Sequence, residues 1–489
     1  HNVFGIQTGV AISFMVKKLS GAKDKRPARV HYVRRPELET ADEKLAFLAS
    51  HPMRGLPFDE VQPDKTGNWL NLTNNDFETL IPLASKETKA AKTAAKERAI
   101  FKLFSLGTST NRDEWVVDFD SQALETRMKW FCHEFDQAAN RAEHPGHLKW
   151  SRNLKRRMAQ GRSEGFDSNL IKPTTYRPFV RQALYDSPLF VDERGDTAAF
   201  FPNRETRNSS ICVIAGDRQP FALVASDVVP NLNLYSADAT KYAALYRYDE
   251  IGSRHDNITD WALKQFTAHY KTPVRPEPVE GLAEASTGSA RTVTGSTESA
   301  GPGAGKARKI TKEAIFHYCY AVLHDPVYRE KYAQNLKREF PRIPFYPGFW
   351  RWAAWGEALM ALHIGYEAVE PFPLARTDTP DEKARAAGLP PKAILRADPA
   401  AGCITLDSET TLRGIPPEAW TYKLGNRCAL DWVLDQYKEK KPKDSTIREK
   451  FDTYRFCDYK EKVIDLLARV TTVSVETVRI VGEMRAAGR

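Results

Sequence analysis

The sequence IFHYCYAVLHDPVYREKYAQNLKREFPRIPFYPGFWRWAAW, residues 315–355, decides the fold of the second half of the chain and predicts helices up to about His363. From Tyr328 onward it holds nine aromatic residues, interleaved with Arg329, Lys331, Lys337, Arg338, Arg342 and Arg351. Aromatic faces beside fixed cations suit a polyanion whose bases can stack. A buried aromatic core with solvated charges on its outer face gives the same pattern. The remaining sequence favours the nucleic-acid interpretation.

Positive charge is concentrated in one part of the chain. The 489 residues carry a net charge of +9, and residues 141–181 contain ten Lys or Arg against three Asp or Glu. A clustered excess of this kind is typical of proteins that bind phosphate groups. A basic membrane-binding segment would need an apolar helical face, but the neighbouring residues are polar and include glycine. The longest apolar run, residues 9–16, is too short to span a bilayer.

The pattern of apolar and turn residues predicts a mixed α/β (α+β) protein of several domains. We expect a first domain to end in residues 1–35, a helical connector over 36–104, one lobe over 105–272 and a second lobe over 310–489. Strands are predicted at 10–16, 30–33, 115–119, 189–191, 198–201, 210–215 and 221–225, with a hairpin at 393–412. Helices are predicted at 40–49, 85–104 and 124–142, and helix caps at 445–446 and 472–474.

Residues 273–309 differ in kind from the rest. Of these 37 residues, 24 are Gly, Pro, Ser, Thr or Ala and none is aromatic. Such a segment buries too little apolar surface to offset its ordering entropy, so we predict a disordered insert. The six cysteines lie at least 25 residues apart and form no CxxC pair. This usage suits a reducing cytoplasm and cysteines that are small buried hydrophobes.

Four motifs resemble sites of other chemistry but lack essential parts. The run GPGAGKA has no Ser or Thr after Lys306 and lies in the insert, so it is not a phosphate-binding loop. Residues 394–407 resemble a strand and loop for S-adenosylmethionine, but the last glycine is missing and a hairpin is favoured. Asp64, Glu87 and Lys89 match a loose nuclease pattern, but the predicted helix keeps them off adjacent strand edges. The histidines show no metal-ligand spacing, so no metal site is expected.

Several segments combine cations with aromatic or amide side chains that suit DNA. The predicted phosphate-binding residues are Lys149, Arg152, Lys155, Arg156 and Arg157 in one helix and its lead-in, and Lys337, Arg338 and Arg342 in the second lobe. Asn and Arg pair bidentately with adenine and guanine, so Asn111 and Arg112 on a loop, and Arg177 beside Tyr176, are predicted to contact base edges.

These segments resemble the C-terminal part of type ISP restriction–modification enzymes. The resemblance rests on IFKLFSLGTSTNRDEWVVDFD, KWSRNLKRRM, KPTTYRPFVRQALY, DNITDWALKQF and KLGNRCALDWVLDQYKEKKPKDSTIREKF, together with most of residues 317–346. The opening HNVFGIQTGVAISFMVKK is similar to the end of an adenine-N6 DNA methyltransferase domain. The resemblance implies a two-lobed target-recognition domain after a remnant of a methyltransferase sheet. It places Phe4 and Gln7 at the edge of the pocket for a flipped adenine.

The expected function follows from that resemblance. The chain would recognise a specific sequence in double-stranded DNA, directing adenine-N6 methylation and ATP-dependent cleavage by methyltransferase, translocase and nuclease domains that precede it. Because the cofactor and catalytic motifs are absent, we expect no catalytic residue and no cofactor in this part. S-adenosylmethionine, ATP and Mg²⁺ are implied for the larger enzyme. Two alternatives stay open: a stand-alone DNA methyltransferase or nuclease, and a protein-interaction scaffold with an incidental basic surface.

Overall fold

The chain forms two compact units, residues 1–74 and 75–489. The computed structural model describes residues 11–16, 28–35, 40–63, 67, 69, 73, 75–216, 218–236, 238–271, 308–451 and 453–489. Phe4, Gln7 and residues 273–307 of the predicted insert lie outside these ranges.

In the first unit, β1 (Val30–Tyr32) pairs antiparallel with β2 (Asp59–Val61), and α1 (Ala41–Ser50) begins after Thr40. The Thr40 hydroxyl accepts the N–H of Glu43 at 3.3 Å, and the Glu43 carboxylate accepts the N–H of Thr40 at 2.8 Å. This capping box explains why the helix begins there. The predicted strand at 30–33 and helix at 40–49 are confirmed. The strand predicted at 10–16 is wrong over its described part, 11–16, which has no strand partner and exposes side chains such as Phe14.

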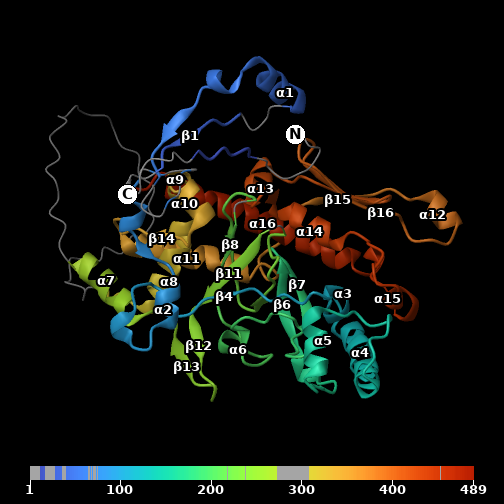
Figure 1. Ribbon diagram of the computed structural model, residues 1–489. Helices are drawn as coiled ribbons and strands as arrows, with labels where there is room; N and C mark the ends of the chain where they lie inside the picture. The colour runs from blue at the N-terminus through green and yellow to red at the C-terminus, as the bar shows by residue number, and fades with distance from the viewer. Residues whose placement is uncertain are drawn as a thin grey trace, which may run out of the picture. The chain divides into compact units, whose positions relative to one another are not determined.

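A four-stranded antiparallel sheet occupies the middle of the second unit (Figure 1). Its order is β4 (Ser105–Leu106), β11 (Ala239–Ala244), β8 (Ser210–Ala215) and β9 (Leu223–Ser226). Side chains alternate between the faces of a strand. Accordingly Cys212 and Ile214 of β8 pack in one hydrophobic core, while Ile211 and Val213 pack in another. The sheet therefore separates two cores, and the strands predicted at 210–215 and 221–225 are confirmed.

The first core surrounds a second four-stranded sheet and three long helices. The sheet is β10 (Val229–Pro230), β6 (Ile171–Arg177), β7 (Val180–Tyr185) and β5 (Val117–Asp118), in which the pair β10–β6 is parallel and the others are antiparallel. The helices are α4 (Ser121–Arg141), α14 (Ala429–Tyr437) and α16 (Lys460–Arg485). Helix α4 begins because Asp120 accepts the N–H groups of Gln122 and Ala123, which confirms the helix predicted at 124–142.

The second core is helical and aromatic. It is built from α7 (Asp260–Lys271), α8 (Lys312–His324), α9 (Pro326–Lys331), α10 (Ala333–Arg338) and α11 (Phe349–Ile364), with the short pair β3 (Ile81–Pro82) and β14 (Arg342–Ile343). Helices α8 and α11 approach so closely at Gly356 that an added Cβ would lie 1.8 Å from the His317 carbonyl oxygen. Tyr318, Tyr328 and Trp352 are fully buried here. For these rings the stacking interpretation of residues 315–355 is wrong, because they form the core instead.

The remaining elements complete the second unit. A third four-stranded sheet runs β15 (Ala375–Asp378), β18 (Thr410–Arg413), β17 (Cys403–Asp407) and β16 (Ala393–Asp398), and it confirms and extends the hairpin predicted at 393–412. The other pairs are β12 (Tyr246–Tyr248) with β13 (Arg254–Asp256) and β19 (Lys423–Leu424) with β20 (Arg427–Cys428). The short helices are α2 (Lys86–Ala90), α3 (Asp113–Val116), α5 (Arg152–Ala159), α6 (Thr197–Phe200), α12 (Glu382–Ala386), α13 (Pro417–Thr421) and α15 (Ser445–Lys450).

Six local predictions are wrong. The helix predicted at 85–104 stops at Ala90, and a helical turn replaces the strand expected at 115–116. Residues 189–191 form a turn, and residues 198–201 are largely helical. The cap predicted at 472–474 lies inside α16, where Ser474 donates to the carbonyl of Val470. The cap of α15 is Asp444, one residue earlier than predicted.

The two hydrophobic cores do not correspond to consecutive parts of the sequence. Each core combines residues from both sides of the 273–309 segment. The mixed α/β class is confirmed, whereas the domain boundaries drawn from the sequence stay a prediction. Within the described ranges, no helix has both the length and the apolar character needed to cross a membrane.

Candidate nucleic-acid interface

The basic residues predicted on helix α5 fall into two sets, one facing the protein and one facing solvent. Ser151 caps the helix by accepting the N–H of Leu154, whose side chain is fully buried. Arg157 lies on the same side, one turn later, and donates to the carbonyls of Leu189, Val191 and Asp192 at 2.8–2.9 Å. Arg157 therefore joins the helix to the following loop, and its half-buried guanidinium offers less surface to a phosphate than the exposed cations of α5 do.

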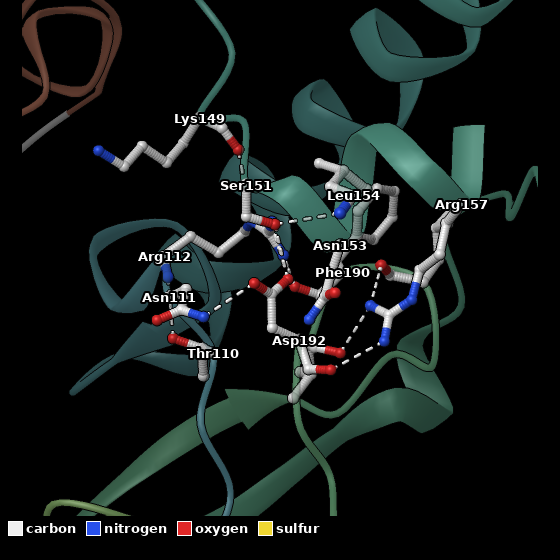
Figure 2. A network of polar contacts seen from close by, with 12 residues as sticks. Thr110, Asn111, Arg112, Lys149, Ser151, Asn153, Leu154, Arg157, Phe190 and Asp192 are labelled. Carbon is white, nitrogen blue, oxygen red and sulfur yellow. Dashed lines mark hydrogen bonds and ion pairs between the residues drawn. The ribbon is translucent and has the colours of Figure 1, made fainter. Parts of the chain in front are cut away.

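The outer face of α5 carries the remaining cations. Arg152, Lys155 and Arg156 are all exposed. At about 100° per residue, these positions span an arc of about 100° on the side opposite Leu154. Lys149, in the lead-in, is also exposed, and Figure 2 shows its side chain extending away from the polar network. Four of the predicted phosphate ligands are thus available at the surface.

Arg112 is buried, which contradicts its assignment to a base edge. The side chain of Arg112 is 0% exposed and that of its partner Asp192 is 2% exposed, with Nη2 and Oδ1 3.2 Å apart. The guanidinium also donates to Ser151 Oγ at 2.7 Å and to the carbonyls of Phe190 and Lys149 (Figure 2). Burial lowers the pKa of Arg112, and the charge of Asp192 opposes that shift. The residue joins three segments of the chain from inside.

Asn111 lies beside this network at the surface. It has a left-handed backbone with φ of 54° and is exposed. Its side-chain amide donates to Asp192 Oδ2 at 2.8 Å, so the carboxylate that neutralises Arg112 also orients Asn111. Asp192 and Ser151 were not among the predicted site residues. An isolated Asp that lies 80 residues from its arginine gives no sequence signal.

Tyr176 and Arg177 adjoin the same loop. The Tyr176 hydroxyl donates to Asp113 Oδ2 at 2.8 Å, and burial followed by the Asp113 charge raises the pKa of Tyr176. The Arg177 guanidinium lies 4.1 Å from the centre of the Tyr176 ring and donates to Asn231 Oδ1 at 3.3 Å. Both side chains are half-buried. Their contacts connect them to the loop that carries Asn111.

The three predicted residues of the second lobe belong to a different place. Lys337 and Arg338 are exposed at the end of α10. Arg342 in β14 is half-buried and its guanidinium lies 2.7 Å from Glu78 Oε2, so its charge is already paired, and it also donates to the Glu78 carbonyl at 3.0 Å. Hydrogen bonds to Asp192 bring together Asn111, Arg112 and the cap of α5 among the first-lobe candidates. In the parts of the chain that the structure describes, no three His, Cys, Asp or Glu residues are placed to hold a metal ion.

A family model for the Type ISP C-terminal specificity domain matches residues 99–466, more than half of the chain. The chain belongs to this family. The specificity domain is also similar to a cryo-EM structure of a DrdV–DNA complex, with 43% identity, a TM-score of 0.81 and coverage of 94% of this chain and 44% of that one. The resemblance predicted from the sequence is confirmed.

Two more distant structures share the fold. One is a nuclease-deletion mutant of the Type ISP restriction-modification enzyme LlaGI in complex with a DNA substrate mimic, at 22% identity and a TM-score of 0.72, covering 94% of this chain and 39% of that one. The other is the ATP-dependent Type ISP restriction-modification enzyme LlaBIII bound to DNA, at 20% identity and a TM-score of 0.69. This match covers 88% of this chain and 26% of that one. The specificity domain spans less than half the length of each of these proteins. No curated protein matches it.

Proposed function

We propose that this specificity domain recognises a target sequence in double-stranded DNA for a Type ISP restriction–modification enzyme in the cytoplasm. The observation that carries the proposal is the similarity to the DrdV–DNA complex, at 43% identity over 94% of the chain. The exposed cations on one face of α5 support it, since phosphate contacts supply most of the affinity of such proteins and fix their position on the duplex.

Roles follow from what each side chain presents. Lys149, Arg152, Lys155 and Arg156 would neutralise phosphates. Asn111, held by Asp192, and Arg177, stacked on Tyr176, would contact base edges in the major groove. Lys337 and Arg338 would bind the backbone at a second place. We leave out Arg112, whose side chain is 0% exposed, and Arg157 and Arg342, which bind three backbone carbonyls and the Glu78 carboxylate respectively.

Methylation and ATP-driven cleavage would belong to other domains of the enzyme, as would S-adenosylmethionine, ATP and Mg²⁺. The segment that most resembles a loop for S-adenosylmethionine does not fit that group. Strands β16 and β17 pair antiparallel across the turn before Cys403, which leaves no strand-to-helix loop to hold a nucleoside. The position of Phe4 and Gln7 near a flipped adenine stays part of the proposal.

Two measurements test DNA recognition. Selection from random duplexes should enrich one sequence, and the selected duplex should bind more tightly than a scrambled one. Titrations at several salt concentrations then compare Lys155→Ala with Lys383→Ala, which removes an exposed lysine from α12. Losing one phosphate contact should reduce the slope of log affinity against log salt by about 0.9 and weaken all sequences alike. The Lys383 variant should keep the original slope.

The outcomes separate the candidate functions. A scaffold would bind DNA weakly and without a preferred sequence. Methyl transfer from labelled S-adenosylmethionine to DNA by this chain alone would favour the stand-alone methyltransferase. Equal slopes for the original protein and Lys155→Ala would remove α5 from the interface.

A further inference from the structure

A small pocket lies between the central sheet and the segment that follows α10. It is lined by Val213, Ile214 and Gly216 at the end of β8, by Lys241 of β11, and by residues 336–341. The pocket holds about 230 Å³, less than the roughly 300–1,000 Å³ of pockets that enclose whole small-molecule ligands. Its size suits a single chemical group rather than a complete nucleotide.

The charge around the pocket is mostly positive. Lys241, Lys337 and Arg338 line it together with Glu339, and the carboxylate of Asp238 packs against Gly216 at its edge. Lys86 at the start of α2 adds a further positive charge close enough to act on Lys241. The charges of Lys86 and Lys241 therefore repel each other beside the pocket. Such an arrangement is stabilised when an anion enters between them.

Lys241 is the residue that most needs such an anion. It lies in the middle of β11, paired with Leu106 of β4 and Val213 of β8, so its backbone is fixed. Its ammonium is 4.9 Å from the centre of the Phe340 ring. Among the residues that the structure describes, no oxygen accepts a hydrogen bond from this ammonium. Burial and the charge of Lys86 both lower the pKa of Lys241, as expected for a cation that has lost water without gaining an acceptor.

The aromatic wall of the pocket is also fixed in place. The Phe340 ring packs edge-on against Phe104 with ring centres 5.0 Å apart. The strand and the Phe340 ring therefore fix the surroundings of the ammonium. A preorganised cation of this kind loses little entropy when it binds a ligand.

We propose that this pocket binds a phosphate group, with Lys241 as its central ligand and Lys337 and Arg338 at its rim. The inference rests on the proposed function, because the phosphate that we assign to it belongs to the backbone of duplex DNA. Lys241 was not predicted from the sequence, since it stands alone in an apolar strand. The pocket gives Lys337 and Arg338 a structural context that the sequence did not supply.

The test compares Lys241→Met, which keeps the length of the stem, with Lys241→Arg, which keeps the charge. In the full chain, Lys241→Met should bind every duplex roughly tenfold more weakly and lower the salt slope by about 0.9. Lys241→Arg should retain the slope. The melting temperature of Lys241→Met should be equal to or above that of the original protein, because a half-buried ammonium without a hydrogen-bond acceptor is lost. This readout distinguishes a lost ligand from a damaged fold.

Inorganic phosphate identifies the source of the group. At constant ionic strength, phosphate should compete with DNA for the original protein more than for Lys241→Met. An unchanged slope and affinity in Lys241→Met would overturn the phosphate site while leaving DNA recognition intact. If the original protein bound no DNA, the proposed function would fail. A phosphate-dependent rise in its melting temperature that Lys241→Met lacks would then assign the pocket to free phosphate, and the absence of such a rise would end the inference.

Discussion

Replacing Arg112 by Ala tests the central polar network most directly. The substitution removes a guanidinium that is 0% exposed and leaves the Asp192 carboxylate, 2% exposed, without its counter-charge. Deleting one partner of a buried ion pair costs about 3–5 kcal/mol. The hydrogen bonds to Ser151 and to two backbone carbonyls are lost as well, which places the expected loss toward the upper end. A domain is typically stable by about 5–15 kcal/mol, so this change removes a large share.

The assay is urea unfolding followed by a spectroscopic signal, with the midpoint and slope fitted separately. Arg152→Ala is the matched control. It removes an exposed arginine next to the same network and should change stability by less than about 0.5 kcal/mol. The cycle of Arg112→Ala, Asp192→Ala and the double variant isolates the pair, and the double variant should lose less than the sum of the single ones. A loss below about 1 kcal/mol for Arg112→Ala, or strict additivity in the cycle, would refute a structural role for Arg112.

Two further predictions concern the helical core and its pH dependence. Gly356→Ala should destabilise the protein by about 3 kcal/mol, because the new Cβ would meet the His317 carbonyl at 1.8 Å. Gly482→Ala is the control: a Cβ there has no atom within 4 Å and should stabilise the protein by about 0.4–1 kcal/mol. Equal urea midpoints for the two variants would contradict the close packing of α8 and α11. Burial lowers the pKa of His363 from 6.5 to about 3, so between these values the unfolded state binds more protons and stability falls as the pH drops below about 6.5. Between pH 7 and pH 5, His363→Gln should lose less melting temperature than the original protein, and identical losses would count against the neutral histidine.

Elements with strong local signals were predictable from sequence. Helix α4 has an Asp120 cap and a long apolar periodicity. Strands β8 and β9 are continuous apolar runs, since both faces of their sheet are buried. Short apolar runs were not predictable, because period alone does not separate a strand from a helical turn. Residues 198–201 are such a case, since Thr197–Phe200 forms a helical turn.

The candidate site was predicted only in part. Sequence reasoning identified Asn111 and α5, which the network does bring together. It did not identify Asp192, which holds Arg112, Asn111 and Ser151 at once. The contact between Asp192 and Arg112 joins residues that are far apart in the sequence, so no local sequence pattern predicts it. The aromatic residues of 315–355 gave a wrong prediction for a related reason. Segments whose rings stack on bases and segments whose rings pack in a core have the same amino-acid composition.

Part of the orientation of α5 could have been deduced from the sequence alone. Leu154 and Met158 are four residues apart and define the apolar face of the helix. At about 100° per residue, Arg152 and Arg156 lie opposite that face, whereas Lys155 and Arg157 flank it on either side. Only the contacts of Arg157 with the following loop show that it turns inward. Three outward cations limit the share of the salt slope that α5 can supply to about 2.7. The number of cations in a basic segment therefore overestimates its contribution to DNA affinity wherever some of those cations are bonded within the protein. Lys172 in β6 is a second such cation, because it is 5% exposed and donates a hydrogen bond to Asp186 at 3.0 Å.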